Sequence, residues 1–391
     1  MAISISKTIS AIPDFYVLSV DKIANDSIKT GKDIIKLNLG KSEVNMHESV
    51  IDTFKQKVSD PISSNIVDSQ GLPELRESIV SYYKKAHKVS FSPKQVFINN
   101  GTSPLLLSLF HVLINEGDTI LLPRPYYPSY NAMADMLHAK KEFYNISNGK
   151  IDLKDFENKF DPEKTKIVVI NSPGNPLGNV LSKQELKEVL DIVNGHAFVL
   201  SDEIYDEFFY EAPSSILQVY DPKRDMLIFL NGFSKIHHMY TRRVGYAIVP
   251  EMVIPVLLRF QQHTLVCVDP VPQYAALTSL KNMDSIMKEE ITKEISEYKK
   301  RLDVCRKIIS KTKLKLIEPK GSWYFCIDIS NYLKADIKNS LDFAKILIEN
   351  AGVAVAPGID FGDDSICRIS LTSSRVVEGT GKICKFLEQL G

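Results

Sequence analysis

The stretch that decides the fold of this chain is Phe229-Leu-Asn-Gly-Phe-Ser-Lys-Ile-His-His-Met-Tyr-Thr-Arg-Arg-Val-Gly-Tyr246. It runs from an apolar, strand-like segment through a Gly-Phe-Ser-Lys turn and then returns to apolar sequence. Lys235 lies at its centre, where a buried strand gives way to a loop. An ammonium group in a water-poor place tends to lose its proton, and the neutral amine is a nucleophile. The stretch therefore predicts a reactive lysine at a strand end.

Two neighbours of this lysine are suited to bind a phosphate. Ser234 supplies a hydroxyl and Arg243 a permanent cation, which together match a phosphate better than a carbonyl group. A lysine accompanied by phosphate ligands indicates pyridoxal 5'-phosphate as the cofactor. The alternative is a loop lysine with a surface arginine, and the spacing alone does not decide between them.

The composition of the chain narrows its class. A length of 391 residues suggests two domains, one large and one small. The formal net charge is zero, so we expect neither nucleic acid nor an anionic membrane as a partner. The chain has no apolar run of membrane-spanning length, and its N-terminus lacks the basic start and apolar core of a secretory signal. We therefore expect a cytoplasmic protein.

The cysteines and histidines do not indicate a metal site. The five cysteines are scattered and form no C-x-x-C pair, so we interpret them as reduced, buried side chains rather than as a disulfide or zinc framework. The adjacent residues His237 and His238 have no third ligand in view, and we assign them a structural or pocket-lining role.

Between residues 70 and 250, apolar strands alternate with helical segments, and polar residues follow several of the strand ends. In an open parallel α/β sheet, such residues meet at the carboxyl edge of the strands. Gly101-Thr-Ser103 enters a helix and could bind an anion there or simply cap the helix. Tyr127 could stack on a flat heterocycle or pack within its loop. Asn175 lies in a loop rich in Pro and Gly that would hold its amide rigidly.

Two further strand ends carry candidate residues. Asp202 could hold a pyridine nitrogen protonated, and Tyr205 could hydrogen-bond a ring oxygen, although Asp202 could equally cap a helix. Gly40 ends a short strand in the segment 33–40, where it would let a ligand approach the backbone or would serve only in a turn.

The C-terminal part of the chain predicts a small α+β domain. It contains a long amphipathic connecting helix at 289–311, strands within 315–328 and 365–371, and helices at 341–351 and 376–390. Arg368 lies inside an apolar strand and requires an anionic partner, either a substrate carboxylate or a protein carboxylate. The expected boundaries are an N-terminal arm joining the small domain at 1–45, a large cofactor-binding domain at 46–285, and a small C-terminal domain at 286–391.

With these motifs, the chain resembles the class I/II aminotransferases, which are fold-type I pyridoxal-phosphate enzymes, over nearly its whole length. The resemblance implies an α/β fold with a large, mostly parallel sheet covered by helices, plus the small α+β domain. The residues that carry it are Asn175-Pro-Leu-Gly178, Ser201-Asp-Glu-Ile-Tyr205, Phe233-Ser-Lys235 with Met239, Arg243, Gly245 and Tyr246, and Cys367-Arg-Ile-Ser370.

The resemblance also implies a role for each candidate residue. Lys235 would carry the internal aldimine and then act as the base that moves the α-proton. Asp202 would pair with the pyridine nitrogen, Tyr205 and Asn175 would hold the ring oxygen, and Tyr127 would stack on the ring. The cofactor phosphate would be bound by Gly101, Thr102, Ser103, Ser234 and Arg243, and the substrate carboxylate by Gly40, Asn175 and Arg368.

Some positions depart from the family pattern. Leu177 replaces the usual threonine, and Ile66 stands where a tyrosine often reaches the phosphate of the neighbouring subunit. Thr102 replaces a lysine of some aspartate-specific members, which argues against a dicarboxylate substrate. The run His237-His-Met-Tyr-Thr-Arg242 occupies positions where small residues are commoner, and its bulk would reshape the pocket.

Three functions remain open from the sequence. The first is a homodimeric aminotransferase with shared active sites that moves an amino group between an L-amino acid and a 2-oxo acid. The second is a pyridoxal-phosphate lyase, cyclase or oxidase, since Gly71-Leu-Pro-Glu-Leu-Arg76 and Pro125-Tyr-Tyr-Pro128 also resemble the aminocyclopropane-carboxylate synthase branch. The third is a non-catalytic regulator, which would need a basic DNA-binding module that the roughly forty neutral residues before the fold do not provide.

Overall fold

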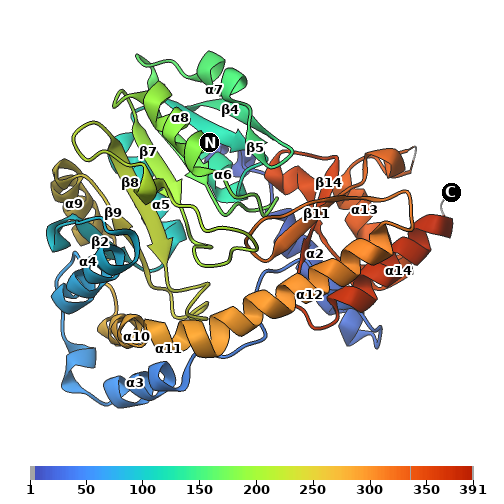
Figure 1. Ribbon diagram of the computed structural model, residues 1–391, viewed down its shortest axis with the longest axis horizontal. Helices are drawn as coiled ribbons and strands as arrows, with labels where there is room; N and C mark the ends of the chain where they lie inside the picture. Colours follow the sequence, from blue (N-terminus) through green and yellow to red (C-terminus); the bar gives the residue numbers. More distant parts are fainter. Residues whose placement is uncertain (1–4, 335, 390–391) are drawn as a thin grey trace.

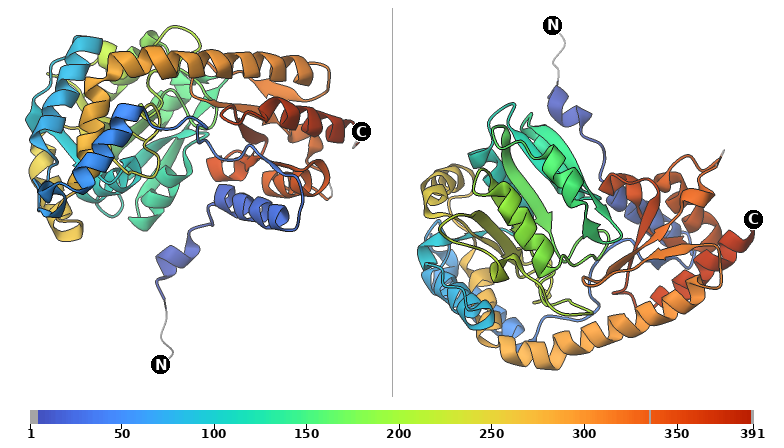
Figure 2. Two further views of the ribbon diagram at one scale, coloured as in Figure 1. Left: turned by 90° about the horizontal axis from the view of Figure 1, so that it is seen from below. Right: turned by 45° about the horizontal axis from the view of Figure 1, so that its top comes forward.

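The structure of the chain is a computed structural model, which describes residues 5–334 and 336–389. A large sheet with helices on both faces lies beside a smaller sheet, and the long helix α12 (Thr292–Ile309) runs from one to the other (Figure 1). Both views of Figure 2 show α12 along one side of the molecule. The start of the N-terminus considered above, residues 1–4, and the expected end of the last helix at Leu390 lie outside the described residues.

The large sheet confirms the prediction of a mostly parallel α/β fold. The five adjacent strands β8, β7, β6, β3 and β4 are parallel, while β9 is antiparallel to both of its neighbours and β5 is antiparallel to β4. The strands, in spatial order, are β2 (Val96–Asn99), β9 (Gly245–Ile248), β8 (Met226–Gly232), β7 (Phe198–Asp202), β6 (Thr165–Asn171), β3 (Thr119–Arg124), β4 (Lys140–Ser147) and β5 (Lys150–Ile151).

Strands β3, β6, β7 and β8 are mostly apolar and buried because helices cover both faces of the sheet. In β6, Ile167 and Val169 join the core on one face and Val168 and Ile170 the core on the other, as the two-residue period of a strand requires. One core includes residues of α5 (Thr102–Leu113), α6 (Pro128–Met136) and α9 (Ile254–Thr264). The other includes residues of α3 (Glu48–Val58), α4 (Pro73–His87), α7 (Leu153–Lys159), α8 (Lys183–Val193) and α10 (Pro270–Lys281).

The smaller sheet is antiparallel and carries Arg368 in its third strand. Its order is β10 (Lys315–Ile317), β11 (Tyr324–Asp328), β14 (Ile366–Ser370) and β13 (Ala356–Pro357). A separate parallel pair joins β1 (Ile35–Lys36) to β12 (Val353–Ala354), so the N-terminal segment lies against the C-terminal part of the chain. The remaining helices are α1 (Lys7–Ala11), α2 (Tyr16–Lys29), α11 (Met283–Ile286), α13 (Ser340–Ile346) and α14 (Val376–Gln389).

The helices and the cysteines bear on the expectations about membranes and disulfides. None of the helices that the structure describes is both long and apolar enough to cross a membrane. The five cysteines are free thiols, and all but Cys267 are buried.

Candidate active site

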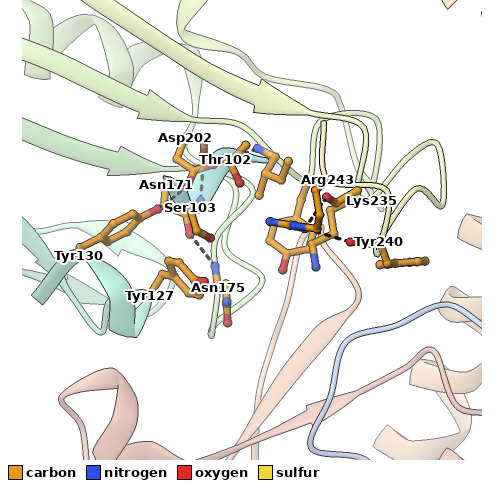
Figure 3. Close-up of a pocket in the computed structure, with 13 residues that line it drawn as sticks. Thr102, Ser103, Tyr127, Tyr130, Asn171, Asn175, Asp202, Lys235, Tyr240 and Arg243 are labelled. Atoms are coloured by element: carbon orange, nitrogen blue, oxygen red, sulfur yellow. Dashed lines mark hydrogen bonds between the residues drawn. The ribbon is translucent and has the colours of Figure 1, made fainter. Parts of the chain in front are cut away.

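A cavity of about 300 Å³ opens at the carboxyl ends of the central strands (Figure 3). Asn171 is the last residue of β6, Asp202 is the last residue of β7, and Lys235 follows the end of β8. Parallel strands place such positions at one edge of the sheet. The cavity is lined by Thr102, Ser103, Tyr127, Tyr130, Asn171, Asn175, Asp202, Ile204, Tyr205, Ser234, Lys235, Tyr240 and Arg243.

Lys235 extends into this cavity among aromatic rings. Its Nζ atom lies 5.3 Å from the ring centre of Trp323, 5.4 Å from that of Tyr205 and 5.7 Å from that of Tyr240. Burial lowers the pKa of the Lys235 ammonium, and the positive charges of Arg368 and Arg243 lower it further, against opposing contributions from Tyr324 and Asp202. The site therefore raises the share of Lys235 that is a neutral, nucleophilic amine.

Asp202 is a buried carboxylate with two hydrogen-bond donors. The Tyr130 hydroxyl donates to Oδ2 over 2.6 Å, and the Ile204 amide donates to Oδ1 over 3.2 Å. Burial raises the pKa of Asp202 to about 6, although these hydrogen bonds and the charge of Lys235 act in the opposite direction. Asp202 caps no helix in the described structure, since a turn follows β7. A cation placed beside Asp202 would lower this pKa and stabilise the charged carboxylate.

The start of α5 and the residues before β9 form a cradle for an anion. No side chain caps α5, whose N-terminal amides are therefore free to bind a ligand. Gly101, the N-cap residue, has a φ of 94°, and a Cβ atom there would overlap the guanidinium group of Arg243. Arg243 donates to the Ser234 hydroxyl over 3.3 Å and to the Tyr240 carbonyl over 2.9 Å. This set of donors fits the phosphate of pyridoxal phosphate.

Arg368 lies just outside the cavity lining and is joined to it through Asn175. Its Nη1 atom donates to Asn175 Oδ1 over 2.7 Å, and its Nη2 atom donates to the Asn38 carbonyl over 2.6 Å. The guanidinium carbon lies 4.1 Å from the ring centre of Tyr324, while the buried Nε atom has no hydrogen-bond partner. Among residues 5–334 and 336–389, no carboxylate forms an ion pair with Arg368, so a structural ion pair does not explain its burial.

Gly40 and Tyr205 both lie against the side chain of Tyr324. The Tyr205 hydroxyl donates to the Tyr324 hydroxyl over 3.2 Å. A Cβ atom at Gly40 would overlap the Tyr324 hydroxyl and the Trp323 indole, so this position requires glycine. The structure thus brings all the candidate site residues into one neighbourhood. The sequence did not point to Asn38, Tyr130, Asn171, Trp323 and Tyr324, although Tyr130 follows Tyr127 by three residues. Tyr240 belongs to the run 237–242 that was expected to reshape the pocket, and it lines the cavity.

The two adjacent histidines are buried and do not line the cavity. His237 Nδ1 lies 2.6 Å from the Ser279 hydroxyl, and burial lowers the pKa of His237 to about 3. His238 Nε2 lies 2.7 Å from Glu294 Oε2. In the part of the chain that the structure describes, no group of three or more His, Cys, Asp or Glu side chains could hold a metal ion.

Comparison with known proteins places this geometry in a class. Residues 32–380 match the family model described as aminotransferase class I and II. An aspartate aminotransferase of Thermotoga maritima is 31% identical over 393 residues, covering 98% of this chain and 99% of the relative. A (5-formylfuran-3-yl)methyl phosphate transaminase of Methanocaldococcus jannaschii is 28% identical over 98% of this chain and 100% of the relative. A solved aspartate aminotransferase structure from Thermotoga maritima has a TM-score of 0.88 at 29% identity, covering 98% of this chain and 100% of that one.

The fold and these neighbours define a fold-type I pyridoxal-phosphate enzyme. The chain belongs to the aminotransferase class I and II family. Its reaction is therefore the transfer of an amino group between an amino acid and a 2-oxo acid, with pyridoxal phosphate as the cofactor. The relatives do not favour the lyase, cyclase or oxidase alternative.

Proposed function

We propose that Lys235 is the covalent attachment point of the cofactor and the base of the aminotransferase reaction. The observation that carries this proposal is the enclosed position of Lys235, where burial lowers the pKa of its ammonium group. As a neutral amine, Lys235 would hold the cofactor through its aldehyde group, and as a free amine it would act as the base that takes the α-proton of a bound amino acid. Bound pyridoxal phosphate supplies the electron sink that makes the α-proton acidic.

Asp202 holds the ring nitrogen of the cofactor in its charged form. Its carboxylate is fixed by Tyr130 and the Ile204 amide, so it can meet a ring N–H without rearranging. Tyr127 lines the cavity and would stack on the ring. The Asn175 amide and the Tyr205 hydroxyl, once turned away from Tyr324, would donate to the ring oxygen. The ring is thereby held among three different strand ends.

The cofactor phosphate binds at the start of α5. The free amides of Thr102 and Ser103, the Ser234 hydroxyl and the Arg243 guanidinium supply its donors, and Gly101 leaves space for Arg243. The positive end of the helix dipole adds to their attraction.

The substrate carboxylate binds to Arg368, with Asn175 and the backbone at Gly40 beside it. The unpaired Nε atom and the lack of an ionic partner among the described residues leave this buried guanidinium ready for an anion. Relatives named as aspartate aminotransferases make aspartate the first amino donor to test, although Thr102 argues against a second carboxylate.

The protein acts as a cytoplasmic homodimer with shared active sites. Free thiols are typical of a reducing compartment. Val58, Ile66 and Val266 are exposed apolar side chains, with 64%, 80% and 49% of their surface accessible, and a second copy of the chain would cover them. Ile66 has no hydroxyl and cannot supply the phosphate contact of a tyrosine. We propose the domain boundaries 1–45, 46–285 and 286–391, supported by the pairing of β1 with β12.

The experiment that tests the proposal is the absorption spectrum of the purified protein, alone and after each amino acid of a panel added without any keto acid. We expect a visible band that Lys235→Ala abolishes and that Lys164→Ala, at an exposed lysine paired with Asp161, leaves unchanged. Particular amino acids should replace the band by that of the amine form of the cofactor, and the panel then names the donor. A band that survives Lys235→Ala would overturn the assignment of Lys235.

A further inference from the structure

The loop between β8 and β9 carries both Lys235 and Arg243, and its shape depends on a residue in an unusual conformation. His238 has a φ of 53°, in the left-handed region that a side chain other than glycine seldom adopts. Its amide donates to the Lys235 carbonyl over 3.2 Å, and the next amide, of Met239, donates to the Phe233 carbonyl over 3.1 Å. The backbone position of Lys235 is therefore tied to the conformation of His238.

The side chain of His238 anchors this conformation to α12. His238 Nε2 lies 2.7 Å from Glu294 Oε2, and both side chains are almost fully buried. The Ser42 and Tyr298 hydroxyls both donate to the other oxygen of Glu294, Oε1. Burial raises the pKa of Glu294, but these hydrogen bonds and the charge of His238 lower it more, so the carboxylate is ionised at neutral pH. One buried carboxylate thus joins three separate segments of the chain.

A second path leads from Glu294 back to the cavity through Ser42. The Ser42 amide donates to the Tyr240 hydroxyl over 2.9 Å, and the Tyr240 carbonyl accepts from Arg243 over 2.9 Å. Lys235, Tyr240 and Arg243 lie together on the loops beside the cavity in Figure 3. Glu294 therefore holds the loop at two points, His238 and Tyr240, which lie between Lys235 and Arg243 in the sequence.

Glu290 provides an internal comparison. It lies one turn before Glu294 on the same side of the helical segment, and its Oε2 atom lies 3.9 Å from His238 Nδ1. Both of these atoms are buried and lack a hydrogen-bond partner. Glu290 faces the same imidazole without holding it, so replacing Glu290 changes a nearby charge but removes no hydrogen bond of the loop.

We propose that His238 and Glu294 are positioning residues of the aminotransferase, which fix Lys235 and Arg243 relative to each other by tethering their common loop to α12 and to Ser42. Neither residue lines the cavity, so both act through the loop. The inference rests on the proposed roles of Lys235 as the attachment point and of Arg243 as a phosphate ligand. No other part of the described chain ties this loop to α12 through a charged hydrogen bond.

The test compares Glu294→Gln and His238→Ala with Glu290→Gln in the otherwise intact protein. Gln at position 294 keeps the shape of the side chain but loses its charge. His238→Gln places an amide nitrogen where Nε2 lies and should rescue the contact. His238→Gly adopts the left-handed conformation freely but has no tether, so it separates the two contributions of this residue. Ser42→Ala removes one hydrogen-bond donor to Glu294, and it replaces Glu294→Gln in the comparison if that variant does not fold.

The readouts are the dissociation constants of the apo-protein for pyridoxal phosphate and for pyridoxal, and the pH midpoint of the visible band. We expect His238→Ala, His238→Gly and Glu294→Gln to raise the dissociation constant for pyridoxal phosphate about tenfold or more and to shift the pH midpoint of the band. Misplacing a binding group by about 1 Å has effects of this size or larger. Pyridoxal, which lacks the phosphate, should lose less affinity. Glu290→Gln and His238→Gln should resemble the unmodified protein.

Two results would overturn the inference. In the first, Glu294→Gln lowers the melting temperature but leaves both dissociation constants and the midpoint unchanged, which makes the pair structural only. In the second, His238→Gly behaves like the unmodified protein, which makes the backbone conformation sufficient. If the unmodified protein showed no band that depends on Lys235, the proposed function itself would fail, and that outcome is distinct from both of these.

Discussion

Arg368 Nη1 donates a hydrogen bond of 2.7 Å to Asn175 Oδ1, so the residue proposed to bind the substrate carboxylate is joined to a residue proposed to bind the cofactor. One residue is in β14 of the smaller sheet and the other follows β6 of the large sheet. This contact therefore links the two sheets at the site where substrate and cofactor must meet.

Replacing Arg368 by alanine should weaken substrate binding and spare the cofactor. Loss of hydrogen bonds to a charged group costs about 1.5–3 kcal/mol, so we expect the amino acid concentration at half-saturation to rise roughly 10- to 150-fold. The measurement is a titration of the cofactor band with the amino acid that converts it. Arg306→Ala, at an exposed arginine paired with Asp303 and Glu318, is the control. A half-saturation that stays unchanged in Arg368→Ala would contradict the assignment.

The raised pKa of Asp202 predicts that the free energy of unfolding of the apo-protein depends on pH. Its pKa in the folded protein is raised from 3.8 to about 6, so its favourable contribution is present below pH 3.8 and is lost as the pH rises through 6. Above pH 6 the charged carboxylate costs up to roughly 3 kcal/mol, at 1.36 kcal/mol per pKa unit. The apo form of Asp202→Asn should therefore be more stable than the unmodified apo-protein at pH 8, and the difference should shrink at pH 5.

Urea unfolding of both apo-proteins at the two pH values measures this effect. With pyridoxal phosphate bound, the unmodified protein should be more stable than Asp202→Asn, because only the carboxylate pairs with a charged ring nitrogen. Equal stabilities of the two apo-proteins at pH 8 would show that Asp202 is not held in an unfavourable charged state.

Gly40 and Gly381 form a pair of matched glycine positions. A Cβ atom at Gly40 would overlap Tyr324 and Trp323, whereas at Gly381, inside α14, nothing lies within 4 Å. Gly40→Ala should therefore displace Tyr324 and lower kcat/KM at least about tenfold. Gly381→Ala should leave activity unchanged and stabilise the helix by about 0.5–1 kcal/mol. Activity assays and thermal melts of the two variants check this, and a fully active Gly40→Ala would mean that the neighbouring rings move aside freely.

The proposed dimer predicts different effects for two exposed apolar residues. Ile66 borders a groove with Phe54 and Val58, whereas Met252, which is 68% exposed, lies elsewhere on the surface. Ile66→Asp should shift the protein towards a monomer in sedimentation experiments, because it would bury a charge in the interface. Met252→Asp should leave the dimer intact. Identical sedimentation of Ile66→Asp and Met252→Asp would count against an interface at this groove.

The sequence predicted the central strands well because their burial on both faces leaves a continuous apolar run. The apolar run 165–171 coincides with β6, and Ser182 and Glu185 form a capping box at the start of α8. Strand β4 (Lys140–Ser147), which lies next to the short edge strand β5, was not predicted, because its many charged and polar residues resemble a loop. The antiparallel direction of β9 was not predicted either. It depends on how the loop that carries Lys235 reverses the chain, and the short strand sequence itself does not encode its direction.

The candidate site was predictable where motifs are local and was missed where contacts are distant. Tyr324 reaches Arg368 because β11 pairs with β14, with Cys326 opposite Arg368, and a register between strands so far apart leaves no trace in either segment. The link between Tyr130 and Asp202 likewise joins a helix to a strand end that is distant in sequence.

The phosphate cradle also determines when the protein can acquire its cofactor. Gly101 and Arg243 meet only because β2 pairs with β9, with Asn99 opposite Gly245. Contacts between such distant segments form late, because the long intervening chain must first be organised. A growing chain on the ribosome would have no complete phosphate site until β9 had emerged and paired. Binding of the cofactor therefore requires that β2 and β9 have paired at the antiparallel edge of the large sheet. A chain truncated before residue 243 would lack the Arg243 guanidinium altogether.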